Sequence, residues 1–181
     1  MLVTLGTRPQ ARTLDQSDPN TLLLDCHERI RRFSSLGVRL ATVQAPPPEI
    51  AEVASRVHRY FTVALPLHVA DEDLSVRPRL LAAHPSRELV DALGTMTSEH
   101  LEIEDLLAEL TSVWSTLIED PTRLASFGAQ LTRASTHLEE LLRRHLTLEE
   151  EVVLPSLSRL LPPEVQAELV REMRARRGVG G

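Results

Sequence analysis

The sequence has little of what disulfide frameworks, thiolate metal sites and membrane spans require. Its 181 residues include a single cysteine, Cys26, which excludes an internal disulfide and any metal site built from several thiolates. No apolar run approaches the roughly 18 residues of a membrane-spanning helix, and no secretory signal is recognisable at the start. We therefore expect a cytoplasmic protein that does not bind a membrane.

Residues that favour strands and turns are also scarce. Aromatic residues make up 3% of the chain and glycines number only seven, whereas 42% of the residues are hydrophobic and 25% are charged. This composition is typical of a globular helical protein. The length suits one domain with a substantial core.

Positive charge is in the minority. The formal net charge is −6, the sequence pI is about 5.6, and lysine is absent, so that all twenty basic residues are arginines. Nucleic-acid binding usually requires a basic face, which this balance does not provide. We expect no nucleic-acid partner.

Apolar residues recur at helical spacing in four long stretches, which predict helices at about 21–43, 48–76, 86–118 and 122–154. Proline-rich or turn-forming segments separate them, and a shorter helix is predicted at 164–176 after Pro162 and Pro163. The pattern indicates an all-α fold, an up-down-up-down four-helix bundle with a short extra C-terminal helix. The expected divisions are an irregular N-terminal arm at 1–18, the bundle at 19–161, and the C-terminal helix and tail at 162–181.

One pattern of candidate metal ligands occurs twice. Each copy has a histidine, a glutamate four residues later and a proline ten residues later: His68, Glu72 and Pro78, then His145, Glu149 and Pro155. The two copies are 77 residues apart. Residues four apart in a helix share one face, so each copy presents an imidazole and a carboxylate to the same neighbour. Each copy is therefore half of a metal site.

Two further histidines fall at matching positions. His100 is followed by Glu104 at the same spacing, and His27 lies on the apolar side of the first predicted helix. With a rise of about 1.5 Å per residue, His27, His68, His100 and His145 lie at a similar level of an antiparallel bundle. That level is nearer the end that carries the 77–85 connection. Four imidazoles and two or three carboxylates are thus predicted to meet in the interior.

Carboxylates buried at that level need cations, because an unpaired charge in an apolar interior is costly. Imidazole and carboxylate donors without a thiolate suit iron or manganese better than copper(I) or a structural zinc. Two metal ions would provide enough coordination positions for the four imidazoles and the carboxylates predicted at this level. An even division gives each ion two histidines, with Glu72 and Glu149 bridging, and leaves positions open for a small molecule.

These residues resemble the haemerythrin-like, or HHE cation-binding, domain family over about residues 20–160. The resemblance rests on His27, on His68 and Glu72 within the Asp71-Glu72-Asp73 run followed by Pro78, on His100, and on His145 and Glu149 followed by Pro155. It implies a four-helix bundle with a non-haem centre of two iron ions, joined by an oxo or hydroxo group, with manganese as the less favoured metal. It also implies His27, His68, His100 and His145 as terminal ligands, and Glu72 and Glu149 as bridges. Ferritin-like proteins use Glu-x-x-His instead, a spacing that no histidine here has.

One position departs from the oxygen-carrying members of that family. Those members are usually described with two histidines at i and i+4 on the third helix, and here Glu104 stands at the second place. We therefore expect Glu104 to bind one iron or to form a hydrogen bond beside it. The predicted metal-site residues are His27, His68, Glu72, His100, Glu104, His145 and Glu149.

Other polar residues are expected to lie outside the centre. His58 and His137 are rotated away from the ligand face, Glu150 and Glu151 are expected in solvent, and Cys26 is expected to be structural. For Asp71, a surface position is favoured over one that orients an imidazole. Arginines near the end of the last helix, from Arg171 to Arg177, suit the helix dipole.

Two classes of function follow from this site. In the first, the two irons bind or react with a small diatomic molecule or a peroxide, namely O2, NO or a peroxide. In the second, the chain senses, stores or delivers iron or oxygen without catalysis, and residues 162–181 serve as a docking helix for a protein partner. The sequence favours the first class and does not decide whether the protein is an enzyme.

Overall fold

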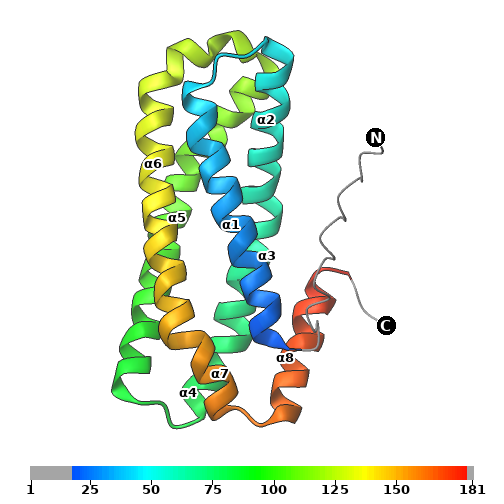
Figure 1. Cartoon of the computed structure of the whole chain (residues 1–181), viewed down its shortest axis with the longest axis vertical. Coiled ribbons are helices and arrows are strands. Elements are labelled where there is room, and N and C mark those ends of the chain that lie inside the picture. Colours follow the sequence, from blue (N-terminus) through cyan, green and yellow to red (C-terminus); the bar gives the residue numbers. More distant parts are fainter. Residues whose placement is uncertain (1–17, 179–181) are drawn as a thin grey trace, which may run out of the picture.

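The computed structural model describes residues 18–178, and within that range helices account for nearly all of the chain. The helices form four long rods and the final helix α8. In Figure 1 the rods lie side by side, with successive rods running in opposite directions and α8 beside one end. The predicted all-α, up-down-up-down bundle with an extra C-terminal helix is thereby confirmed. No helix within residues 18–178 combines the length and the apolar character that a membrane span needs.

The first and third rods are single uninterrupted helices, α1 (Pro19–Thr42) and α5 (Arg87–Glu119). A side-chain oxygen caps each of them. The Asp18 carboxylate accepts a hydrogen bond from the Thr21 amide at 3.2 Å, and the hydroxyl of Ser86 caps α5 in the same way. Such caps satisfy amides that have no partner inside the first helical turn.

The second and fourth rods each pass through short, wide π-helical turns. The second rod consists of α2 (Pro47–Arg59), the π-turn η1 (Tyr60–Ala64), α3 (Leu65–Asp71), the π-turn η2 (Glu72–Val76) and α4 (Arg77–Ala82). The fourth consists of the 3-10 turn η3 (Pro121–Arg123), α6 (Leu124–Leu148), the π-turn η4 (Glu149–Val153) and α7 (Leu154–Leu160). The final helix is α8 (Pro163–Arg176).

Each π-turn ends two residues before a proline, namely Pro66, Pro78 or Pro155. A proline has no amide to donate to residue i−4, and its ring crowds that carbonyl. The wider turn shifts the hydrogen-bond register just ahead of the ring, so the helix continues beyond it. The prediction that the second and fourth helices end near residues 76 and 154 was wrong for this reason, since the rods continue to Ala82 and Leu160.

A polar layer divides the apolar interior into two clusters. One cluster, which includes Trp114, fills the half of the bundle towards the α1–α2 and α5–α6 connections. The other, which includes Leu80, fills the half where α8 docks. Along α5, Met96 belongs to the second cluster and Ile103 to the first, and His100 lies between them. Burial of these two clusters supplies the main driving force for folding and holds the polar layer in place.

The last helix packs on the outside of the bundle through apolar and charged contacts. Leu169 and Met173 of α8 join the second apolar cluster. Arg176 and Arg177 donate to the carboxylate of Asp71, with nitrogen–oxygen distances of 2.8 Å and 2.6 Å. α8 is thus attached to the residue that directly precedes Glu72.

Candidate metal centre

The polar layer contains six buried side chains that form two adjoining groups. One group consists of His27, His68, Glu72 and Glu149, and the other of Glu72, His100, His145 and Glu149. In each group the candidate ligand atoms lie within 4.8 Å of one another. All six side chains are at most 7% exposed. The two glutamates belong to both groups, so the layer can hold two cations side by side.

Each glutamate directs its two carboxylate oxygens to different groups. In Glu72, Oε1 lies 3.0 Å from Nε2 of His68 and Oε2 lies 3.2 Å from Nε2 of His100. This is the arrangement required of a carboxylate that bridges two ions, with one imidazole on either side.

Glu149 repeats this arrangement from the opposite side of the bundle. Its Oε2 lies 3.1 Å from Nε2 of His27, and its Oε1 lies 2.9 Å from Nε2 of His145. The four imidazoles are therefore divided into two pairs, each of which meets one oxygen from each glutamate.

Within residues 18–178, most of these ligand atoms have no hydrogen-bond partner. The buried atoms without one include Nε2 of His27, His68 and His100, Oε2 of Glu72, and both oxygens of Glu149. Buried polar atoms are nearly always paired, because an unpaired one keeps its full desolvation cost. Lone pairs that converge on shared points without donors fit metal cations, and the nitrogen and oxygen donor set suits a hard or borderline metal.

Without a metal, the pKa values of Glu72 and Glu149 are shifted in opposite directions. Burial and the nearby Glu149 carboxylate raise the pKa of Glu72 well above its usual value. For Glu149, burial also acts to raise the pKa, but the interactions with the nearby imidazoles of His145 and His27 outweigh it and hold the pKa well below its usual value. One proton would thus remain on Glu72, which a metal ion must displace.

The pKa values of two of the imidazoles, His68 and His145, are also shifted in opposite directions. Burial, together with the neighbouring histidines, lowers the pKa of His68 to about 3. For His145, the interactions with Glu149 and Glu99 outweigh the effect of burial and raise the pKa to about 9. Neutral His68 is ready to bind a metal, whereas His145 must lose a proton first.

Three of the four imidazoles are held from behind by a carboxylate. The Nδ1 atoms of His27, His100 and His145 lie 2.8 Å from Glu150, 3.2 Å from Asp73 and 3.0 Å from Glu99, respectively. Such a contact fixes the ring and the tautomer and makes the other nitrogen a stronger metal donor. In contrast, Nδ1 of His68 is buried and has no hydrogen-bond partner among the residues that the structure describes.

The structure brings together six of the seven residues that the sequence predicted, and Glu104 is the exception. Its side chain is exposed and belongs to neither group, which corrects its predicted place at the centre. The reason is visible in the backbone. Glu72 and Glu149 each begin a π-turn, whereas α5 is uninterrupted at Glu104 and has Leu110, rather than a proline, ten residues after His100.

Two other expectations are also corrected. Glu150, expected in solvent, contacts His27 and receives hydrogen bonds from Arg31 at 2.8 Å and 2.9 Å. Asp71, expected at the surface, is 1% exposed because α8 covers it and its arginines bind it.

Sequence reasoning did not identify Glu99 or Asp73 as partners of imidazoles. Glu99 directly precedes His100, and Asp73 directly follows Glu72. Successive side chains of a helix point about 100° apart, so neither carboxylate was expected to face the same way as its neighbour. Each carboxylate contacts a histidine of another rod, so the contact depends on how the rods pack and cannot be read from the spacing within one helix. His58 and His137 lie away from the centre, as expected: neither belongs to the two groups, and His137 is paired instead with Glu102 at 3.4 Å.

Four antiparallel helices with two adjoining histidine and glutamate groups in their interior define a metal-binding helical-bundle protein. Comparison with protein families narrows this class, because residues 18–157 match the Hemerythrin HHE cation binding domain. The match spans most of the chain, and the chain therefore belongs to this family of cation-binding domains. No curated protein matches the chain at a significant level. Helix α8 lies beyond the matched residues.

Proposed function

We propose that the six residues of the polar layer hold two iron ions, and that this pair binds or reacts with O2, NO or a peroxide. The observation that carries the proposal is the division of the glutamate oxygens. Each of Glu72 and Glu149 offers one oxygen to each pair of imidazoles, which suits two ions a short distance apart. The absence of thiolate donors favours iron, and manganese is the second choice.

The side chains have separate tasks in this function. The four imidazoles bind and orient the metal pair, and the carboxylates of Glu72 and Glu149 bridge it and offset its charge. Glu99, Asp73 and Glu150 act from behind on three of the rings. When bound, a pair of irons supplies electrons to, or accepts them from, a small molecule. Two histidines and two bridging carboxylates leave coordination positions open for such a molecule.

The donor count favours reaction over reversible oxygen carriage. The groups contain four histidines, and Glu104 occupies the place of the additional histidine expected for an oxygen carrier without reaching the centre. Fewer protein donors leave more positions open to peroxide, NO or O2. A reduced centre with this ligand set is expected to oxidise quickly in air.

Metal analysis with optical spectra tests the proposal. The spectra would be recorded as isolated, after dithionite, and then after air, peroxide or NO. We expect two irons per chain and an absorption band that dithionite removes and an oxidant restores. One zinc per chain, or no bound metal, would show that the proposal is wrong.

The attachment of α8 favours sensing as a second candidate function. Asp71 is joined to Arg176 and Arg177, and the next residue, Glu72, faces the metal centre. A change at Glu72 can therefore be transmitted to α8. If iron or oxygen sensing is the function, protease cleavage within α8 should differ between the reduced and oxidised protein. Equal cleavage rates would exclude this second candidate.

A further inference from the structure

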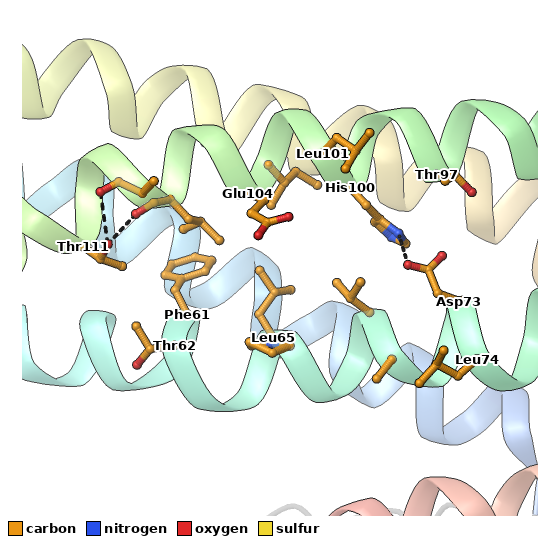
Figure 2. Close-up of a pocket in the computed structure, with 16 residues that line it drawn as sticks. Phe61, Thr62, Leu65, Asp73, Leu74, Thr97, His100, Leu101, Glu104 and Thr111 are labelled. Atoms are coloured by element: carbon orange, nitrogen blue, oxygen red, sulfur yellow. Dashed lines mark hydrogen bonds and ion pairs between the residues drawn. The ribbon is translucent and has the colours of Figure 1, made fainter.

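A cavity of about 650 Å³ lies beside the metal centre, between α5 and the segment formed by η1, α3 and η2. Ten of its sixteen lining residues are apolar, and Leu74 and Leu101, which are 67% and 63% exposed, belong to it. Its volume falls within the range of small-molecule sites, which are mostly apolar with a few polar groups. His100 and its partner Asp73 also line it (Figure 2).

The lining of the cavity contains acidic side chains and no arginine or lysine. The acidic side chains are those of Asp73 and Glu104. Figure 2 shows Glu104 extending from α5 into the space between the two rods. Among residues 18–178, Glu104 has no hydrogen-bond or ion-pair partner. A charge at the edge of an apolar cavity, without a partner, favours a cationic ligand.

The hydroxyl and imidazole donors of the cavity are already used. The hydroxyls of Thr62, Thr97 and Thr111 donate to backbone carbonyls of their own helices, at 2.8 Å, 3.0 Å and 2.7 Å. Nδ1 of His100 is engaged with Asp73. The cavity therefore offers acceptors and no free side-chain donor. A ligand must bring the donors itself.

We propose that this cavity is a second ligand site, for an organic ammonium ion with an apolar body. The apolar part fills the space lined by side chains such as Leu65 and Leu107, and the N–H donors bind the Glu104 carboxylate. This assigns a role to Glu104, which the metal centre does not use although its predicted partner His100 belongs to that centre. It also places a ligand beside His100, which belongs to that centre.

Calorimetric titration of the full-length, metal-loaded protein with n-octylammonium tests this site. Octanol and octanoate serve as probes of the same chain length. A hydrogen bond to an ionised group is stronger than a neutral one, so we expect octylammonium to bind once per chain and about tenfold more tightly than octanol. Octanoate should bind most weakly.

Two variants locate the site. Glu104→Gln should remove the preference for ammonium over alcohol while leaving the metal content unchanged. Asp105→Asn is the matched control, because Asp105 is also exposed on α5 but does not line the cavity. Ala108→Trp fills the apolar part, and should abolish binding of all three probes.

Three results would overturn the proposal. The first is the absence of saturable octylammonium binding, and the second is an equal loss of preference in Glu104→Gln and Asp105→Asn. The third concerns the exposed leucines: if the protein is a dimer that Leu101→Glu converts to a monomer, a second copy of the chain covers this face. A monomer that binds octylammonium through Glu104 supports the proposal.

Discussion

Asp71 and Glu72 are adjacent buried carboxylates that face opposite partners. Glu72 meets His68 and His100 in the polar layer, whereas Asp71 accepts hydrogen bonds from arginines of α8. The backbone between them passes from α3 into the π-turn η2. The position of a candidate metal ligand, Glu72, is thus linked to the docking of a helix outside the domain match.

Removing both arginines should destabilise the protein. In Arg176→Ala with Arg177→Ala, Asp71 stays buried without its two cationic partners, and breaking a buried ion pair on one side costs about 3–5 kcal/mol. Urea denaturation of the double variant measures the loss. Arg171→Ala is the control, since the side chain of Arg171 is 68% exposed and makes only a weak ion pair with Glu168, at a long nitrogen–oxygen distance of 3.9 Å. Equal stability of both variants would mean that α8 is not held through Asp71.

Removing the metal should also lower stability, because Glu72 and Glu149 then remain buried without cations. If metal is present at about one hundred times its dissociation constant, each bound ion contributes about 2.7 kcal/mol. For two ions in a protein of this size the midpoint of thermal unfolding should then fall by about 10–20 °C. Thermal melts before and after chelation, with the metal content verified, measure this change. An unchanged midpoint would place the two carboxylates in contact with solvent.

The carboxylates behind the imidazoles should strengthen metal binding. Glu99→Gln weakens the hold on His145, and loss of such a partner typically reduces metal affinity by about 10–100-fold. Asp73→Asn and Glu150→Gln should act similarly through His100 and His27. Competition with a coloured chelator gives the affinities.

Glu151→Gln is the control for that series, because Glu151 is exposed and is next to Glu150 in the chain. Its metal affinity should equal that of the unaltered protein. If Glu99→Gln and Glu151→Gln bind metal equally well, the contacts at Nδ1 do not contribute to binding.

The metal-free protein should lose stability as the pH rises from about 6.5 to about 9. The pKa of His145 is raised from 6.5 to about 9 in the folded state. Its stabilising effect is therefore complete below pH 6.5 and is lost as the pH passes through 9, a change on the order of 3 kcal/mol. The raised pKa of Glu72 acts in the same direction. The lowered pKa of His68 destabilises the fold only below pH 6.5.

Urea denaturation of the chelated protein at both pH values measures this dependence. The metal-loaded protein is the control, and its stability should not fall over the same range, because metal binding itself requires deprotonated ligands. Equal stability of the chelated protein at pH 6.5 and pH 9 would show that His145 carries no stabilising proton.

The sequence already contained a way to tell the two pairs of which both members join the polar layer from the third pair, of which only His100 does. His68–Glu72 and His145–Glu149 are each followed by a proline at the tenth position, and His100–Glu104 is not. In the structure, both of those prolines follow a π-turn that begins at the glutamate. The four-residue spacing alone also predicted Glu104, because it identifies residues on one face of a regular helix. It does not indicate whether a π-turn begins at the glutamate.

Local periodicity determined the four rods, the extra helix and six of the side chains in the polar layer. These features are readable because the helical repeat relates neighbouring residues of one segment directly to a shared face. The contacts of Glu99, Asp73, Glu150 and Asp71 were decided only by the tertiary structure. Each of these carboxylates meets a residue of a different rod or of α8. Such pairings depend on how separate helices rotate and pack against one another, which no repeat within a single helix records.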